Sequence, residues 1–149
     1  MLLRFRQDVI ALRPKAVVIH AGTNDLGGNT GPMLIEDIEA NCASMVEIAR
    51  ANAVRVILCS LLPPAHKETL SSRFSLFKHP PGKILELNRW LEDYSASRGC
   101  DFLNYFDAMS DGQGFVERSF SEDGLHPTAA GYRVMAEIAQ ATIEQTLKS

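Results

Sequence analysis

Three short apolar runs divide this chain, and the segments between them have helical periodicity. The runs cover residues 16–20, 54–61 and 101–106, and the first two are rich in valine and isoleucine. Uninterrupted apolar strands separated by helices are typical of parallel sheets, which are buried on both faces. We therefore expect the order α-β-α-β-α-β-α, and the fold class of a three-layer α/β/α sandwich with a parallel sheet.

The helical segments are predicted from apolar residues that recur every three or four positions. Pro14 ends the first of them, and Gly99 follows the third as a helix C-cap. The dipeptide Pro80-Pro81 with Gly82 indicates a strong stop before the third helix. Helices are expected at residues 2–12, 34–52, 83–98 and 128–147, and irregular segments at 27–32, 65–81 and 110–123.

Length and composition describe one globular domain over residues 1–149. The net charge is -3 and the basic residues are scattered, so nucleic-acid binding is not expected. Cys42, Cys59 and Cys100 lie far apart in apolar contexts, which favours buried thiols over a disulfide framework or a metal site. No apolar run approaches the ~20 residues that span a bilayer. Residues 1–6 lack the pattern of a signal peptide, which leaves the compartment open.

The segment Asp123-Gly-Leu-His126-Pro127 places a carboxylate and an imidazole three residues apart. Histidine exchanges protons near neutral pH, and a carboxylate bonded to its second ring nitrogen fixes the tautomer. Asp123 and His126 are therefore candidates for a general base and its orienting group. A surface turn in which Asp123 caps the next helix would give the same spacing.

A second polar segment, Gly22-Thr23-Asn24-Asp25, follows the first apolar run. In parallel sheets, ligands bind beyond the carboxyl ends of the strands, where this segment falls. The Asn24 amide could donate to an oxyanion, Gly22 permits a tight turn, and Asp25 could stabilise the loop. Plain turn chemistry remains the alternative. A phosphate-binding loop is a poorer fit, because the segment has no lysine.

Together these two segments resemble the SGNH (GDSL-like) ester hydrolases. Gly22-Thr23-Asn24-Asp25 is similar to the third sequence block of that family, and Asp123-x-x-His126 to the fifth, in the same order. The run from Thr128 to Tyr132 and the strand end from Leu58 to Pro63 also resemble the family. The similarity extends over essentially all 149 residues and implies a flavodoxin-like sandwich.

The resemblance implies a role for each of these residues. Asn24 would be an oxyanion-hole donor, with Gly22, Thr23 and Asp25 supporting its loop, His126 would be the base, and Asp123 its orienting partner. Such enzymes hydrolyse carboxylic esters of short to medium acyl chains and use neither metal nor organic cofactor. The family's Gly-Asp-Ser nucleophile block does not occur in the 149 residues. We therefore expect a fold missing its first strand or strands, and at best a very poor esterase, because losing the serine of a comparable triad costs about 10⁶ in kcat.

Other side chains could take part, and the sequence leaves their roles open. Ser60 ends the second strand and is the candidate substitute nucleophile; Cys59 beside it would face the opposite side of the sheet. Ser121 is better explained as a loop-stabilising hydroxyl. Of the other histidines, His20 is expected to pack or bond near Asn24, while solvated and substrate-lining roles are equally open for His66 and His79.

Without the family's first strand, the strand at residues 16–20 would keep an open edge. Unpaired backbone groups at an apolar edge invite pairing with another chain. We therefore expect a homodimer or larger homo-oligomer that forms through the edge at Val17–Ile19. A non-catalytic α/β module for assembly or ligand binding is the alternative to an ester hydrolase.

Overall fold

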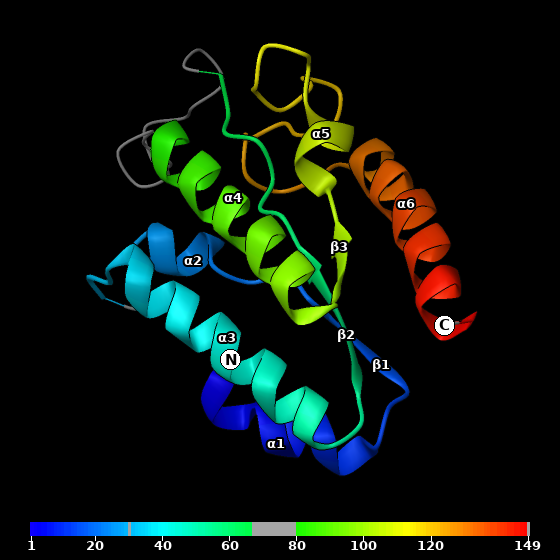
Figure 1. The fold of residues 1–149 in the computed structure, drawn as a ribbon. Helices are drawn as coiled ribbons and strands as arrows, with labels where there is room; N and C mark the ends of the chain where they lie inside the picture. Colours follow the sequence, from blue (N-terminus) through cyan, green and yellow to red (C-terminus); the bar gives the residue numbers. More distant parts are fainter. Residues whose placement is uncertain (30, 67–79, 149) are drawn as a thin grey trace.

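The computed structural model describes residues 1–29, 31–66 and 80–148 as helices, strands and connecting loops (Figure 1). Its three strands all run in the same direction. The elements in chain order are η1 (Leu2–Arg4), α1 (Phe5–Asp8), η2 (Ile10–Leu12), β1 (Ala16–Ile19), α2 (Thr23–Leu26), α3 (Ile35–Ala51), β2 (Arg55–Cys59), α4 (Pro81–Arg98), β3 (Asp101–Leu103), α5 (Tyr105–Met109) and α6 (Ala129–Lys148).

The sheet has the order β1-β2-β3, so β2 is its central strand. Val17 lies beside Val56 in the first parallel pair, and Leu58 beside Phe102 in the second. β2 is accordingly the most deeply buried strand: only Arg55, its first residue, is exposed. The expected α/β class with a parallel sheet is confirmed.

Helices cover both faces of this sheet, as Figure 1 shows. Val56 and Leu58 point into the larger core, which α3 and α4 complete with residues such as Val46 and Leu87. Ile57 and Cys59 point to the opposite face, where they meet a smaller core that includes Met135 of α6. The alternation of side chains along β2 therefore joins the two helical layers through one strand.

The N-terminal segment differs from its predicted form. One helix over residues 2–12 was expected, but Val9 has φ -120° and ψ -64°, which divides the segment into η1, α1 and η2. Its last turn ends at Arg13, whose φ is +50°. The apolar spacing indicated a buried face correctly, since Phe5 is buried, but it could not show that the backbone leaves the helical conformation at Val9.

Two further boundaries were wrong. The third helix was expected to begin at Lys83, after a stop at Pro80 to Gly82, but Pro81 is its first residue, a position where the missing N–H costs nothing. The third strand was expected to reach residue 106, but it ends at Leu103. Asn104 then caps α5 by accepting a hydrogen bond from the Asp107 N–H.

Candidate active site

The loop before α6 holds the Asp123–His126 pair. Asp123 Oδ2 lies 2.7 Å from His126 Nδ1, and Asp123 Oδ1 accepts hydrogen bonds from the backbone N–H groups of Leu125 and His126 at 2.9 and 2.8 Å. Ser121 Oγ donates to the carbonyl of His126 at 2.9 Å, which is the loop-stabilising role expected for it. Since Asp123 binds Nδ1, any proton transfer to a substrate would use Nε2.

The environment keeps Asp123 ionised. Burial alone would raise the pKa of its carboxyl group. Hydrogen bonds from the His126 ring and from the backbone N–H groups of His126 and Leu125 outweigh burial and lower the pKa to about 2. A carboxylate that stays charged is suited to holding an imidazole and stabilising an imidazolium.

The loop that carries Asn24 begins at a glycine that the packing requires. Gly22 has φ +113°, and a Cβ at this position would meet Leu87 Cδ2 at 3.1 Å. The segment was expected to be a turn, but residues 23–26 form the short helix α2, with Gly22 at its N-cap. Asn29 Nδ2 donates to Asn24 Oδ1 at 3.1 Å, which fixes the orientation of the Asn24 amide and so the direction of its donor group, Nδ2.

One pocket of about 280 Å³ receives both segments. Asn24 and His126 line it together, although they are about 100 residues apart in the chain, and Thr23 contributes to the same wall. Most of the remaining lining is apolar and comes from the segment after β2 and from α4 and α6: Leu61, Leu62, Pro63, Pro64, Ala65, Ile84 and Met135. The pocket lies where β1 and β2 end, the edge of the sheet at which the sequence placed the chemistry.

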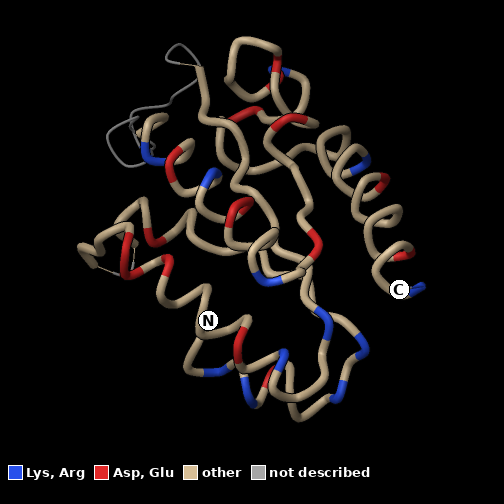
Figure 2. Tube along the Cα trace, in the orientation of Figure 1, with Lys and Arg blue, Asp and Glu red and all other residues tan. Residues whose placement is uncertain are grey.

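The lining of the pocket itself is free of Lys, Arg, Asp and Glu among the described residues, although Asp123 is bonded to the lining residue His126. Figure 2 shows Lys and Arg gathered at the opposite end of the molecule, around α1 and the turns that lead into β1 and β2. Such a lining is mostly apolar, with a few polar atoms from Thr23, Asn24 and the two histidines.

Ser60 is not placed to act on a substrate in this pocket. Its side chain is buried, with 1% exposure, and its Oγ accepts a hydrogen bond from the Phe106 N–H at 2.8 Å. It joins the end of β2 to the start of α5. The suggestion of Ser60 as a substitute nucleophile is therefore not supported by its position, and among the described residues no serine lines the pocket.

The other histidines have different surroundings. His20 lines the pocket and packs against the Tyr105 ring at 5.3 Å, and burial lowers the pKa of its imidazole. His66 was expected to be either solvated or part of the substrate pocket. It is mostly buried, does not line the pocket, and is bonded to Asp111 at 2.7 Å. His79, and most of the segment 65–81 that was predicted to be irregular, lie outside the described residues.

Sequence reasoning missed two pocket residues of α6, Tyr132 and Met135. Their spacing marks one face of a helix, but only the packing of α6 next to the His126 loop turns that face toward the pocket. Gly131 makes this approach possible, since a Cβ there would lie 2.7 Å from the Phe120 carbonyl oxygen.

In the part of the chain that the structure describes, no group of three or more His, Cys, Asp or Glu side chains could hold a metal ion. The same residues include no helix with the length and hydropathy needed to cross a membrane.

The chain belongs to the GDSL-like lipase/acylhydrolase family, whose model matches residues 1–134. It is similar to a GDSL-like lipase from Bacteroides thetaiotaomicron, at 39% identity and a TM-score of 0.87 over 97% of this chain and 69% of that one. A structure from Bacteroides fragilis is also 39% identical, with a TM-score of 0.88 over 98% and 69% of the two chains.

A third similar structure shares the fold alone. It is an acetylxylan esterase from Geobacillus stearothermophilus, 19% identical with a TM-score of 0.75 over 95% of this chain and 64% of that one. A comparison with curated proteins found no match.

Proposed function

We propose that this chain carries the proton-transfer and oxyanion-binding parts of a carboxylic ester hydrolase site. The observation that supports this most directly is that Asn24 and His126 line one pocket, with Asp123 bonded to His126 Nδ1 at 2.7 Å. In this proposal His126 Nε2 accepts the proton of an attacking hydroxyl, Asp123 stabilises the imidazolium, and Asn24 Nδ2 donates to the developing oxyanion.

The pocket lining favours a neutral ester with an apolar acyl group of short to medium length. We propose that Leu61, Leu62, Pro64 and Met135 receive the acyl chain, because they surround the pocket without any charged side chain among them. The Gly-Asp-Ser block is absent from the 149 residues, and we infer that these residues alone hydrolyse esters very poorly.

Ligand binding tests the site without requiring turnover. Hexanamide, a neutral amide that mimics the acyl part of an ester, should shift the NMR signals of the Asn24 side-chain amide and the His126 ring. Asn24→Ala should weaken binding roughly tenfold if one hydrogen bond to the carbonyl is lost in a shielded pocket. Asn52→Ala, which removes an amide whose only described bond is to the carbonyl of Ile48, is the matched control.

Turnover is the second test. Hydrolysis of p-nitrophenyl acetate should stay at the level of the His126→Ala variant, and a fluorophosphonate probe should leave the intact mass unchanged. A fluorophosphonate adduct on Ser60, or turnover that vanishes in His126→Ala, would contradict the proposal of very weak activity. Hexanamide shifts confined to residues away from Asn24 and His126 would contradict the assignment of the site.

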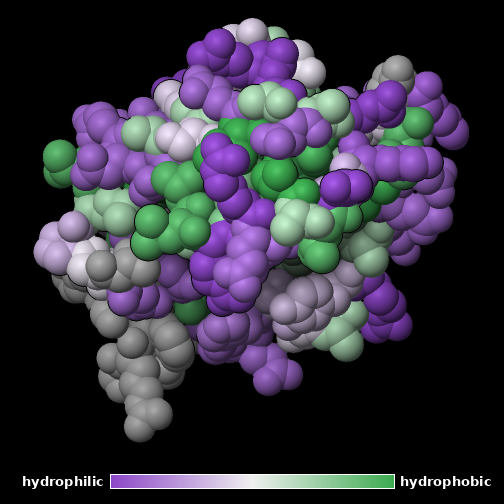
Figure 3. Space-filling model, turned by 90° about the horizontal axis from the view of Figure 1, so that it is seen from below, coloured by the Kyte–Doolittle hydropathy of each residue, from purple (hydrophilic) through white to green (hydrophobic). Residues whose placement is uncertain are grey.

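A role in assembly is the second candidate, and the exposed edge of the sheet favours it. Of the described strands, β1 pairs with β2 alone, and Val18 is 39% exposed. Figure 3 shows the face of the molecule seen from below, on which hydrophobic and hydrophilic side chains lie side by side. An apolar edge strand without proline or charge is an open template for pairing.

We propose a second copy of this chain as the partner of β1. The Lys15 carbonyl accepts from the Arg55 N–H, so residues 15, 17 and 19 are bonded toward β2, while Ala16 and Val18 direct their N–H and C=O groups to the open edge. Two copies of β1 related by a two-fold axis could pair antiparallel, with Ala16 opposite Val18 of the partner, and form four hydrogen bonds.

Light scattering tests this assembly. The chain should be dimeric at micromolar concentration, and Val18→Lys should make it monomeric, because a charge on an edge strand opposes pairing. Leu85→Lys, at a leucine of α4 that is 48% exposed, is the matched control. A monomer at every concentration would exclude the dimer and leave the ester-hydrolase proposal untouched.

A further inference from the structure

The wall of the pocket that follows β2 has no regular secondary structure of its own. Residues 61–65 have neither helical nor strand hydrogen bonding, and Pro63 and Pro64 lack an N–H, yet all five residues line the pocket. A segment of this kind keeps one conformation only if other elements hold it. The shape of the pocket therefore depends on what bonds to this wall.

Two attachments hold the beginning and middle of the wall. Asn88 of α4 accepts from the Leu61 N–H at 2.7 Å and donates to the Leu61 carbonyl at 3.2 Å. The Val116 N–H then donates to the Pro64 carbonyl at 2.9 Å, which joins the wall to the loop after α5.

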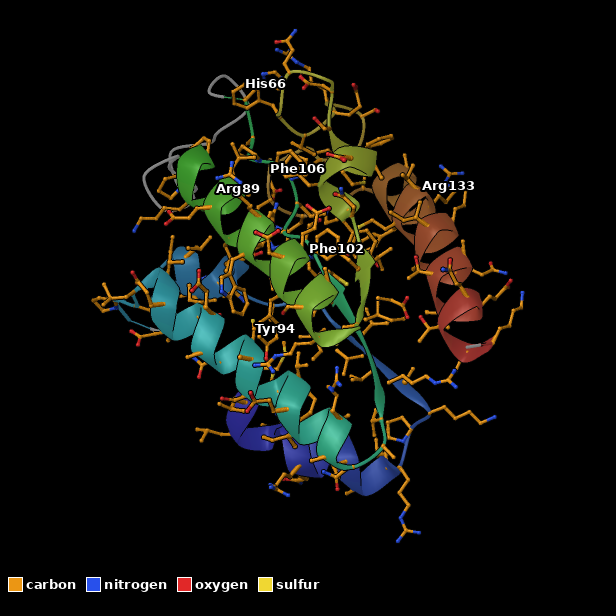
Figure 4. All side chains as sticks on the ribbon, in the orientation of Figure 1. His66, Arg89, Tyr94, Phe102, Phe106 and Arg133 are labelled. Atoms are coloured by element: carbon orange, nitrogen blue, oxygen red, sulfur yellow. The ribbon has the colours of Figure 1, made fainter. Side chains whose placement is uncertain are left out.

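A third attachment fixes the end of the wall, through a second histidine–aspartate pair. His66 Nε2 lies 2.7 Å from Asp111 Oδ2, and the two side chains are only 18% and 14% exposed. The Phe115 ring stacks on the His66 ring at 4.6 Å, with 26° between their planes. Figure 4 shows His66 beside the loop that follows α5.

Asp111 is itself held in place by the loop to which it belongs. Its Oδ1 accepts from the backbone N–H groups of Gln113 and Phe115 at 2.8 and 3.2 Å, and its own N–H donates to the Phe115 carbonyl at 2.8 Å. The loop thus presents a carboxylate and an aromatic face in fixed positions, and His66 fits between them.

The two histidine–aspartate pairs seen among the described residues differ in geometry and exposure. His126 bonds its aspartate through Nδ1, and its side chain is 69% exposed at the pocket. His66 bonds its aspartate through Nε2, at the tip of the ring, and does not line the pocket. The geometry of the His66–Asp111 pair therefore suits a structural contact between two loops rather than a general base.

We propose that His66 and Asp111 are positioning residues that lock the 61–65 wall against the 110–116 loop and thereby set the shape of the pocket. The proposal concerns the wall itself; only its consequence for ligand affinity rests on the proposed function. The lock joins two segments that are 45 residues apart, so it can act on the pocket without contacting a ligand.

Hydrogen exchange at the Val116 amide measures the lock directly, because that N–H donates to Pro64 in the wall. In His66→Ala the exchange of this amide should accelerate roughly tenfold or more, as expected from losing one hydrogen bond to a charged group. The Leu61 amide, which Asn88 holds from α4, is the internal control and should keep its rate. His66→Gln should restore most of the protection, because its Nε2 can donate to Asp111 from a similar distance along the side chain.

Hexanamide affinity gives the second readout. His66→Ala should weaken binding by about three- to tenfold. Asp111→Ala also removes the bonds to the Gln113 and Phe115 N–H groups, so it should weaken binding at least as much. The double variant should match Asp111→Ala, because the bond to His66 is already lost in that variant. Asp93→Asn, at an exposed residue of α4, is the matched control. Unchanged exchange at Val116 in His66→Ala, or equal acceleration at Val116 and Leu61, would overturn the lock. If hexanamide fails to bind even the unmodified chain, the proposed function is at fault, and the exchange experiment still decides the lock.

Discussion

Replacing Gly131 by alanine sets two physical effects against each other. Gly131 is near the start of α6, where alanine should favour the helix by about 1 kcal/mol. The tertiary structure opposes this gain, because a Cβ would lie 2.7 Å from the Phe120 carbonyl oxygen and 2.9 Å from Met109 Cε. The methionine methyl can move aside, but the backbone carbonyl is held: the Thr128 N–H donates to it at 2.8 Å.

Overpacking of this kind costs about 1–3 kcal/mol, so we expect a net loss of up to about 2 kcal/mol after the helical gain is subtracted. That loss corresponds to a fall in Tm of up to about 8 °C for a domain of this size. The shift of α6 should also displace the loop of Asp123 and His126 and weaken hexanamide binding.

Urea unfolding followed by circular dichroism measures the change in stability. Gly82→Ala is the matched control, because this glycine is also helical, in α4, and a Cβ there would meet nothing within 4 Å. Gly82→Ala should stabilise the chain by up to about 1 kcal/mol. If Gly131→Ala is as stabilising as Gly82→Ala, the close approach of α6 to Phe120 does not exist as described.

Three further predictions concern the backbone, the carboxylate and the thiols. Ala53 has φ +56°, a conformation that glycine adopts more readily than alanine, so Ala53→Gly should raise the free energy of unfolding in urea by about 0.5–1 kcal/mol. The control Ala51→Gly, in α3, should lower it by a similar amount. The pKa of Asp123 is lowered from 3.8 to about 2, so its contribution to stability should be complete above about pH 4 and disappear as the pH falls toward 2; a carbon-13 NMR titration whose midpoint is near 4 would contradict this. Burial raises the pKa of Cys42 to about 11 and of Cys59 to about 12, so both thiols should stay protonated at pH 8. Ellman's reagent should therefore modify the half-buried Cys100 first and the other two only on unfolding, which mass spectrometry of the modified peptides measures.

The repeating elements of this fold were accessible from local sequence alone. Val17 to Ile19 and Val56 to Leu58 are apolar on both faces, and this pattern predicts buried parallel strands wherever the chain places them. The spacing of Ile38, Cys42 and Met45 predicts the buried face of α3, which the structure confirms. These patterns can be read from the sequence because side chains repeat with a fixed period in a helix and in a strand.

Element boundaries were less accessible, because they depend on single hydrogen bonds. The third helix was expected to begin at Lys83 but begins at Pro81, since the fixed φ of proline suits a first turn as well as a break. β3 ends at Leu103 because Asn104 caps α5, and nothing in the period of residues 101–106 distinguishes a cap from one more strand residue.

Some residues of the candidate site could be predicted from the sequence and others could not. Asn24, Asp123 and His126 could be predicted, since these side chains belong to short segments with recognisable spacing. Ser60 was named as a candidate too, but its burial against α5 removes it from the pocket. The pairing of His66 with Asp111 left no local signal, because their segments lie 45 positions apart and neither contains a motif.

The sequence by itself determined the class of fold, the family and the polar groups at the ends of the strands, since short-range periodicity and local motifs encode them. The tertiary structure alone decided which of these groups share one pocket, which hydroxyl is buried, and how the 61–65 wall is held. Those properties arise from contacts through space between segments far apart in the chain, and such contacts exist only once the chain has folded.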